Sequence, residues 1–240
     1  MKNRYKKNID EIFTESIQET LLTKNIAVIG CGGQGGYILE FLARLGVNSI
    51  TFWDGDTFSE TNLNRQIGCN EKTLGQNKAE IMCLKLKEID SSLKLNCKNW
   101  FFGDKETDLE DLLKTDIIFL AGDCYYNIIK MRQLIRQAIL DGIPAIDCPA
   151  NLLGGYVYIE TNNDLGHYDY QTINEIKQSQ ELDNNEYGSQ TAYKCALVAA
   201  EAVNQMVLYF ANSRYANIDS GLNIDIYHHQ YSQFDKYGKF

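Results

Sequence analysis

The stretch IAVIGCGGQGG, at positions 26–36, decides the fold class. An apolar run typical of a buried strand is followed by five glycines in seven residues, and Gln34 to Leu45 then has the apolar spacing of a helix that Gly46 ends. Glycines in such a turn let the backbone approach a phosphate, and the helix N-terminus supplies N–H groups and a positive dipole end. The stretch therefore predicts the first strand–turn–helix unit of a nucleotide-binding domain. It lacks the Gly-Lys-Ser/Thr of a P-loop.

Beyond this unit, strand and helix patterns alternate along the chain. Strands are predicted at 49–53, 93–97, 116–120 and 143–146, and helices at 76–89, 107–113 and 128–140. This alternation predicts an α/β fold with a Rossmann-like, doubly wound, mainly parallel sheet. An amphipathic helix is expected before it, over 8–22. A strand at 155–159, a helix at 191–210 and a strand at 222–227 are expected after it, the strands as C-terminal antiparallel additions.

We therefore expect one domain over residues 1–240, built of four parts. These are an N-terminal helical arm (1–24), a nucleotide-binding core (25–160), a mobile crossover segment (161–189) and a C-terminal helix with strands (190–240). The crossover segment is predicted from its composition, which is polar, acidic and poor in aliphatic side chains.

Composition and charge exclude several classes of protein. Apolar residues make up 44% and charged residues 23%, as in ordinary soluble globular proteins. No apolar run approaches the roughly 20 residues that cross a bilayer, and the N-terminus has no apolar signal region, so we expect a cytoplasmic protein without a membrane partner. The net charge of -9 opposes binding to nucleic acid.

Seven cysteines are present, an odd number, and none forms a Cys-x-x-Cys pair. This spacing argues against a structural zinc site and against a disulfide framework. We expect reduced and mostly buried thiols, and no zinc.

An acidic residue, Asp54, ends the second predicted strand. In a Rossmann unit an acid at this position hydrogen-bonds ribose hydroxyls, which NAD and ATP share. The glycine loop and Asp54 alone therefore do not distinguish a dehydrogenase from an ATP-using enzyme.

The residues that follow do distinguish them. They run Asp54-Gly55-Asp56, then Thr61-Asn62-Leu63-Asn64-Arg65-Gln66, then Gly75-Gln76-Asn77-Lys78. This pattern resembles the signature of the ThiF/MoeB/HesA family of adenylyltransferases, to which the ubiquitin-activating enzymes belong. Arg4-Tyr5 and Gln18-Glu19 resemble the lead-in of the bacterial members, and the resemblance extends over about residues 4–160.

The resemblance implies an enzyme that adenylates a carboxylate with ATP and Mg²⁺. Fixed cations stabilise the charge that develops on phosphoryl oxygens: Arg65 as a planar fork, Lys78 as a point charge. Asn62 is expected to donate its amide to a phosphate and to hold its loop. The nucleotide-binding residues that we predict are Gly30, Gly32, Gly33, Gly35, Asp54, Asp56, Asn62, Arg65, Lys78 and Lys7.

The resemblance also implies a magnesium ligand just beyond the fourth strand, which is Asp123, seven residues after Asp116 at the start of that strand. The predicted catalytic residues are therefore Arg65, Lys78 and Asp123. The family has Asp-Asn or Asp-Ser here, followed by an arginine, whereas this chain has Asp123-Cys124-Tyr125-Tyr126. An alternative register leaves Tyr126 at the metal position, which would indicate a weak or inactive enzyme.

Three functions remain open at this stage. The first is activation of the C-terminal Gly-Gly of a small ubiquitin-like or sulfur-carrier protein. The second resembles the tRNA threonylcarbamoyladenosine dehydratases, against which the acidic charge counts. The third is a non-catalytic nucleotide-binding member of the family. Residues 160–190 contain no cysteine, so the sequence supports adenylation more than thioester transfer.

A homodimer is also expected, in which the N-terminal arm completes the partner's site. Arg4-Tyr5-Lys6-Lys7 matches an Arg-Tyr-x-Arg stretch of the bacterial activators, and the resemblance implies that Lys7 reaches the neighbour's nucleotide.

Overall fold

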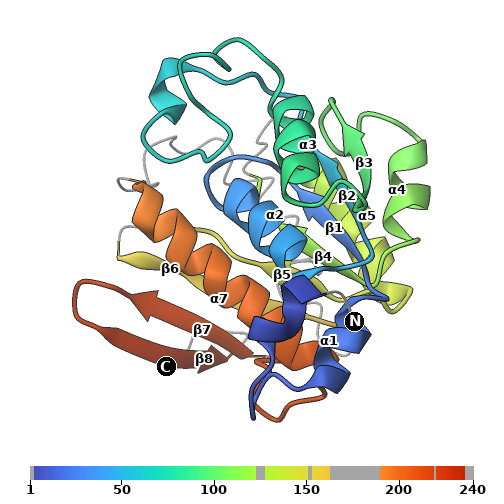
Figure 1. Ribbon diagram of the computed structural model, residues 1–240, viewed down its shortest axis with the longest axis vertical. Coiled ribbons are helices and arrows are strands. Elements are labelled where there is room, and N and C mark those ends of the chain that lie inside the picture. Colours follow the sequence, from blue (N-terminus) through green and yellow to red (C-terminus); the bar gives the residue numbers. More distant parts are fainter. Residues whose placement is uncertain (1–2, 123–127, 151–152, 163–189, 219, 236–240) are drawn as a thin grey trace.

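The computed structural model describes residues 3–122, 128–150, 153–162, 190–218 and 220–235 (Figure 1). The helical elements are η1 (Asn3–Asn8), α1 (Glu15–Leu21), α2 (Gly33–Leu45), η2 (Glu60–Asn62), α3 (Lys78–Ile89), α4 (Thr107–Leu112), α5 (Ile128–Leu140) and α7 (Ala192–Phe210). The strands are β1 (Asn25–Ile29), β2 (Ser49–Trp53), β3 (Lys94–Lys98), β4 (Ile117–Leu120), β5 (Ala145–Asp147), β6 (Gly154–Glu160), β7 (Ser220–Asp225) and β8 (Gln230–Asp235). The expected mobile segment falls almost wholly outside the described residues.

The described strands form one eight-stranded sheet in the order β3-β2-β1-β4-β5-β6-β7-β8. The five strands from β3 to β5 pair in parallel, and the three from β6 to β8 are antiparallel. This arrangement confirms the predicted Rossmann-like sheet with C-terminal antiparallel strands. Because the carboxyl ends of parallel strands share one edge, the loops after β1, β2 and β4 lie together there.

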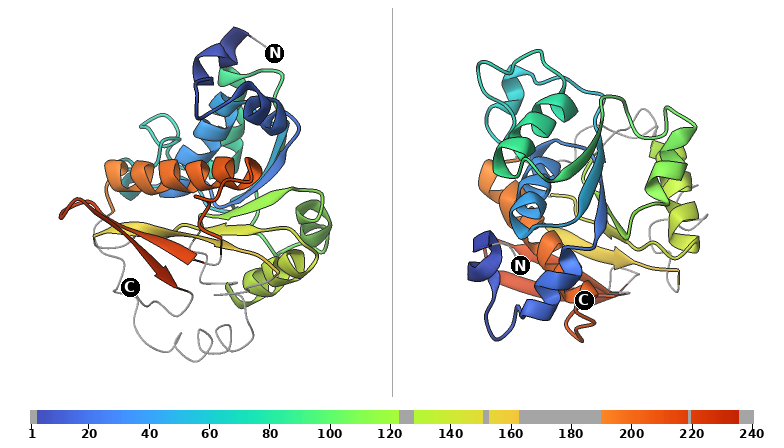
Figure 2. Two further views of the ribbon diagram at one scale, coloured as in Figure 1. Left: turned by 90° about the horizontal axis from the view of Figure 1, so that it is seen from below. Right: turned by 45° about the vertical axis from the view of Figure 1, so that its right-hand side comes forward.

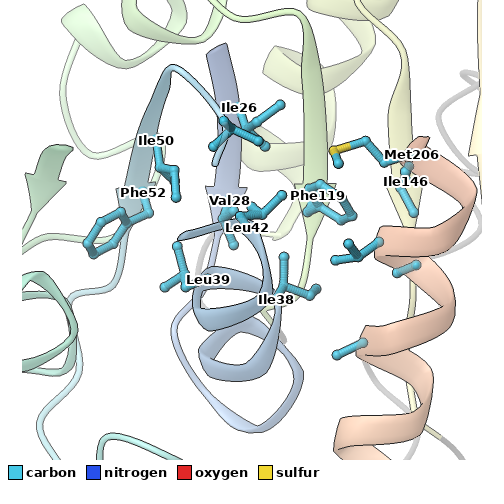
Figure 3. Packing of buried hydrophobic residues seen from close by; sticks show 14 of the residues in the cluster. Ile26, Val28, Ile38, Leu39, Leu42, Ile50, Phe52, Phe119, Ile146 and Met206 are labelled. Carbon is cyan, nitrogen blue, oxygen red and sulfur yellow. The ribbon is translucent and has the colours of Figure 1, made fainter. Parts of the chain in front are cut away.

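Helices cover both faces of the sheet (Figures 1 and 2). Alternate residues of β1 show why: Ile26 and Val28 belong to the core shared with α2, α3 and α7, whereas Ala27 and Ile29 belong to the core shared with α4 and α5. In the core that contains Ile26 and Val28, Leu39 of α2 is fully buried (Figure 3). In the part of the chain that the structure describes, no helix is long and apolar enough to span a membrane.

The N-terminal helix is shorter than predicted. Asp10 accepts the backbone N–H groups of Ile12 and Phe13, at 2.7 and 2.6 Å, and this turn replaces the i→i−4 bonds that both groups would make in a helix starting at residue 8. Thr14 then caps α1 by accepting the N–H of Ile17. The prediction of a helix over 8–22 was therefore wrong in its first half.

A strand that the sequence did not predict, β8, pairs with β7 as a hairpin. Its Phe234 ring lies 5.9 Å from the Tyr156 ring, and it fills the space above Gly221, where a Cβ would collide with it. Cross-strand aromatic contacts of this kind stabilise a polar edge strand that has no aliphatic pattern of its own.

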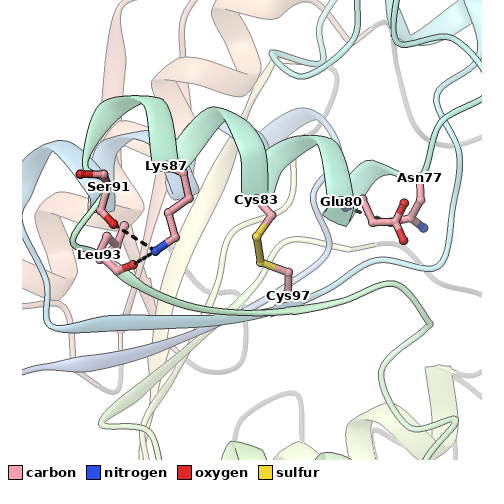
Figure 4. The surroundings of a disulfide bond; sticks show 7 residues. All are labelled: Asn77, Glu80, Cys83, Lys87, Ser91, Leu93 and Cys97. Carbon is pink, nitrogen blue, oxygen red and sulfur yellow. Dashed lines mark hydrogen bonds between the residues drawn. A yellow bond between two sulfur atoms is a disulfide. The ribbon is translucent and has the colours of Figure 1, made fainter.

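A disulfide joins Cys83 of α3 to Cys97 of β3, across a Cα–Cα distance of 6.2 Å (Figure 4). The expectation of reduced thiols throughout was therefore wrong for this pair. Nearby, the Lys87 ammonium donates to the carbonyl oxygens of Ser91 and Leu93 and so holds the turn between the helix and the strand. Helix α3 is thus fixed to the edge of the sheet by a covalent bond and by hydrogen bonds.

Candidate nucleotide-binding site

The glycine loop after β1 is shaped by two close approaches of backbone to backbone. Gly30 has φ +95°, and a Cβ there would lie 2.6 Å from the Cα of Gly122, which follows β4. A Cβ on Gly35 would overlap the carbonyl of Gly30. The space above Gly32 is open by comparison, since its nearest neighbour is the Gln66 side chain at 3.6 Å. Gly32 is therefore the least crowded of the five glycines of this loop.

Asp54 clamps this loop to the end of β2. Its carboxylate accepts the N–H of Cys31 at 2.7 Å and the N–H of Asp56 at 2.9 Å, and the residue is buried. Burial raises the pKa of the Asp54 carboxyl, although the Lys78 charge and the two backbone N–H groups act in the opposite direction. The carboxylate is thus engaged by backbone, and its predicted contact with a ribose stays a prediction.

Lys78 begins α3 and is buried, with 9% of its side chain exposed. Its ammonium pairs with the Asp56 carboxylate at 3.1 Å, and its backbone N–H donates to the Asp56 carbonyl at 2.9 Å. Asn77 caps the helix and donates its amide to the carbonyls of Asp54 and Asp56. Burial raises the pKa of the Cys31 thiol in the glycine loop, and Lys78 opposes that rise. Lys78 is linked to the loop through Asp56, whose N–H bonds the same Asp54 carboxylate that accepts the Cys31 N–H.

Asn62 holds the turn that precedes Arg65. Its side-chain oxygen accepts the N–H of Ser59 at 3.0 Å, and the two residues form a capping box around η2. The loop-holding role that the sequence predicted is present. The predicted amide contact with a phosphate stays a prediction.

Arg65 is held at three points. Its Nε donates to the Gln190 side chain at 2.9 Å, and its Nη1 donates to the Thr61 carbonyl at 3.0 Å and to the Asn64 side chain at 2.9 Å. The Cδ atom lies 3.8 Å from the position of a Cβ on Gly33. Arg65 therefore reaches the glycine loop at Gly33.

The sequence did not predict the approach of α7 to this loop. A Cβ on Gly33 would lie 2.8 Å from the Cys195 Sγ, so the first turns of α2 and α7 are in direct contact. Cys195 is fully buried, and burial raises the pKa of its thiol more than nearby Arg65 lowers it. A thiol in this state is a poor nucleophile at neutral pH. The convergence of two helix N-termini with Arg65 makes the position favourable for an anion.

A second feature that the sequence did not predict is a cluster of hydrogen bonds around Asp108, next to the end of β2. The buried Asp108 carboxylate accepts the indole N–H groups of Trp53 and Trp100, both at 3.0 Å, and the backbone N–H groups of Gly103 at 2.8 Å and Lys105 at 3.1 Å. Trp53 directly precedes Asp54, so this cluster fixes the strand end that holds the glycine loop.

The N-terminal arm lies at the opposite ends of the same helices. Arg4 pairs with Asp90, after α3, at 2.8 Å, and the buried Tyr5 ring packs against Gly46, which ends α2. Lys7 is exposed in η1, at the far end of α2 from the loop, a helix about 20 Å long. Lys7 therefore does not join the site of its own chain. Its predicted contact with a partner's nucleotide stays a prediction.

The predicted magnesium ligand, Asp123, and its alternative, Tyr126, both lie outside the described residues. Among the residues that are described, no group of three or more His, Cys, Asp or Glu side chains could hold a metal ion.

The sequence of the whole chain matches one family. A family model described as the ThiF family covers residues 5–239. The chain belongs to the ThiF family. It is 30% identical over 122 residues to the tRNA threonylcarbamoyladenosine dehydratase of Bacillus subtilis, covering 50% of this chain and 48% of that protein. It is 29% identical over 147 residues to the molybdopterin-synthase adenylyltransferase of Escherichia coli, covering 61% of this chain and 57% of that protein.

Solved structures agree on the fold. Escherichia coli MccB, crystallised with AMPCPP and MccA, matches 99% of this chain and 72% of its own with a TM-score of 0.79 at 19% identity. The chain therefore shares the fold of MccB. The chain spans about half the length of each of the two curated relatives, and their names give different substrates.

Proposed function

We propose that this ThiF-family protein adenylates a carboxylate with ATP and releases pyrophosphate, and that the carboxylate is the C-terminal Gly-Gly of a small ubiquitin-like or sulfur-carrier protein. The observation that supports this most is the position of Arg65 beside Gly33 of the glycine loop, with Lys78 linked to the same loop through Asp56 and Asp54.

The chemistry requires cations at this point. A carboxylate that attacks the α-phosphorus of ATP is an anion approaching an anion, and the transition state concentrates charge on phosphoryl oxygens. The N–H groups at the start of α2 and the fork of Arg65 would receive the phosphates. Lys78 would exchange its contact with Asp56 for one with a phosphate. Mg²⁺, when bound, would neutralise part of the phosphate charge, and the sequence assigns its ligand to Asp123.

The net negative charge of the chain favours a protein substrate over an RNA substrate. The net charge of -9 repels a tRNA backbone, whose binding depends on Lys and Arg contacts with phosphates. One observation nevertheless favours a second candidate, adenylation of a small carboxylate on a tRNA base: the similarity to the Bacillus subtilis dehydratase. We propose a homodimer as the working assembly in either case.

ATP–pyrophosphate exchange tests the proposal. We expect exchange to depend on a Gly-Gly-tailed carrier protein and to fall about 10²–10³-fold in Arg65→Ala and in Lys78→Ala, the usual loss when one donor to a transition-state oxyanion is removed. Matched controls are Arg44→Ala and Lys114→Ala, which remove exposed cations paired with Glu40 and Asp111. Near-normal exchange in both site variants would contradict the phosphate assignment. Exchange that depends on tRNA and ignores carriers would favour the second candidate.

A further inference from the structure

Arg65 is bonded to a residue 125 positions away in the sequence. Gln190 accepts the Arg65 Nε–H on its side-chain oxygen at 2.9 Å. Asn64 closes a ring with both: its amide donates to the Gln190 backbone carbonyl at 3.0 Å, and its side-chain oxygen accepts from the Arg65 Nη1 at 2.9 Å. Gln190 directly precedes Thr191, the N-cap of α7. This ring of three side chains therefore joins the segment before α3 to the start of α7.

The ring fixes the plane of the guanidinium and leaves one end of it available. The bonds use the Nε–H and the Nη1 group, whereas Nη2 has no hydrogen-bond partner among the described residues. An arginine recognises phosphate through the geometry of its fork, so the orientation of that plane decides how many phosphate oxygens it can contact. Both side chains that bond the guanidinium are neutral amides, and the positive charge of Arg65 is therefore not cancelled.

We infer that Gln190 is a positioning residue for Arg65: it holds the guanidinium plane so that Nη2 faces the ligand at the glycine loop. This inference rests on the proposed function, in which Arg65 contacts the phosphates of ATP. It adds that the affinity for nucleotide depends on the residue at the start of α7 as well as on the motif that contains Arg65.

The identity of the side chain matters in two ways. A methionine at position 190 has a similar length but only a weak acceptor, its thioether sulfur, for the Nε–H, so Arg65 would regain rotamer freedom that ATP binding must then restrict again. A glutamate would keep the acceptor and add a negative charge next to the triphosphate. Both changes are expected to weaken ATP binding, the second in a manner that depends on salt and pH.

The experiment measures the dissociation constant of Mg·ATP by calorimetry for the full-length protein and its variants. We expect Gln190→Met to weaken binding about tenfold, the usual effect of losing a hydrogen bond to a charged group, and Gln190→Glu to weaken it further at low salt. Gln137→Met is the matched control, since the Gln137 side chain bonds only Asp141, just after the end of α5, among the described residues. We expect no change in that control.

A double-mutant cycle separates positioning from a general loss of structure. In an Arg65→Ala background, Gln190→Met should change the dissociation constant less than about twofold, because its effect acts through Arg65. Equal tenfold losses in both backgrounds would overturn the inference, as would wild-type affinity in Gln190→Met. If Arg65→Ala itself binds ATP like the wild type, the proposed phosphate site fails together with the inference. Weak binding in Arg65→Ala with normal binding in both Gln190 variants overturns the inference alone.

Discussion

Replacement of Asp108 by alanine should destabilise the protein more than most single substitutions do. Four N–H donors converge on this carboxylate, and two of them, the Trp53 indole and the Gly103 amide, are buried. A buried donor left without an acceptor costs about 1–3 kcal/mol, so the two together cost about 4 kcal/mol. That is a large part of the 5–15 kcal/mol by which a typical domain is stable. Asp108→Asn keeps one acceptor oxygen and should cost about half as much.

Urea unfolding followed by far-UV circular dichroism measures the loss. The midpoint should fall while the slope with urea stays constant, because the surface exposed on unfolding is unchanged. Asp141→Asn is the control. Among the described residues, only Gln137 donates to this exposed carboxylate after α5, at 3.3 Å, and its loss should stay within about 0.5 kcal/mol. A loss below about 1 kcal/mol in Asp108→Ala would refute the reasoning, since the four donors would then be satisfied without the carboxylate.

Three further predictions follow from close contacts. Gly33→Ala should lower the melting temperature, because its Cβ would lie 2.8 Å from the Cys195 Sγ, and a second change, Cys195→Gly, should restore part of the loss. Breaking the disulfide with Cys83→Ser should cost roughly 3 kcal/mol in urea unfolding, and unreduced, denatured wild-type protein should titrate at most five thiols, since Cys83 and Cys97 are paired. The side-chain hydrogen bond from His228 lowers the pKa of the Asp225 carboxyl in the folded protein. The stability that this interaction contributes is therefore fully present above the ordinary pKa near 3.8 and is lost as the pH falls through the lower, folded-state pKa. Asp225→Asn should remove this pH dependence from the unfolding midpoint.

Much of the fold could be predicted from local sequence. The predicted bounds of β2 (Ser49–Trp53) and α5 (Ile128–Leu140) equal those observed. Apolar periodicity indicates the extent of each element, and the Asp or Asp-Gly that follows indicates where it ends. The first half of the predicted N-terminal helix failed because Asp10 satisfies two backbone N–H groups that a helix would need. Strand β8 was missed because its pairing with β7, rather than any pattern of its own, forms it.

The site divides in the same way. Lys78 and Arg65 could be selected because they belong to a motif with fixed local spacing. Gln190 and Cys195 could not, since only the folded chain brings them to the glycine loop. The disulfide was also hidden: its two cysteines lie 14 residues apart, one in a helix and one in a strand, which is no recognised spacing.

The contact between Arg65 and Gln190 also makes the site depend on a part of the chain that is synthesised late. A domain generally folds as a unit, and its C-terminal part is synthesised last. A nascent chain that ends after β5 already contains the glycine loop, Asp54 and Lys78, but it lacks the acceptor for the Arg65 Nε–H and the helix that packs on Gly33. The guanidinium gains its final orientation only once α7 has emerged and docked. A chain released early would therefore keep the motif that identifies the family without the complete site.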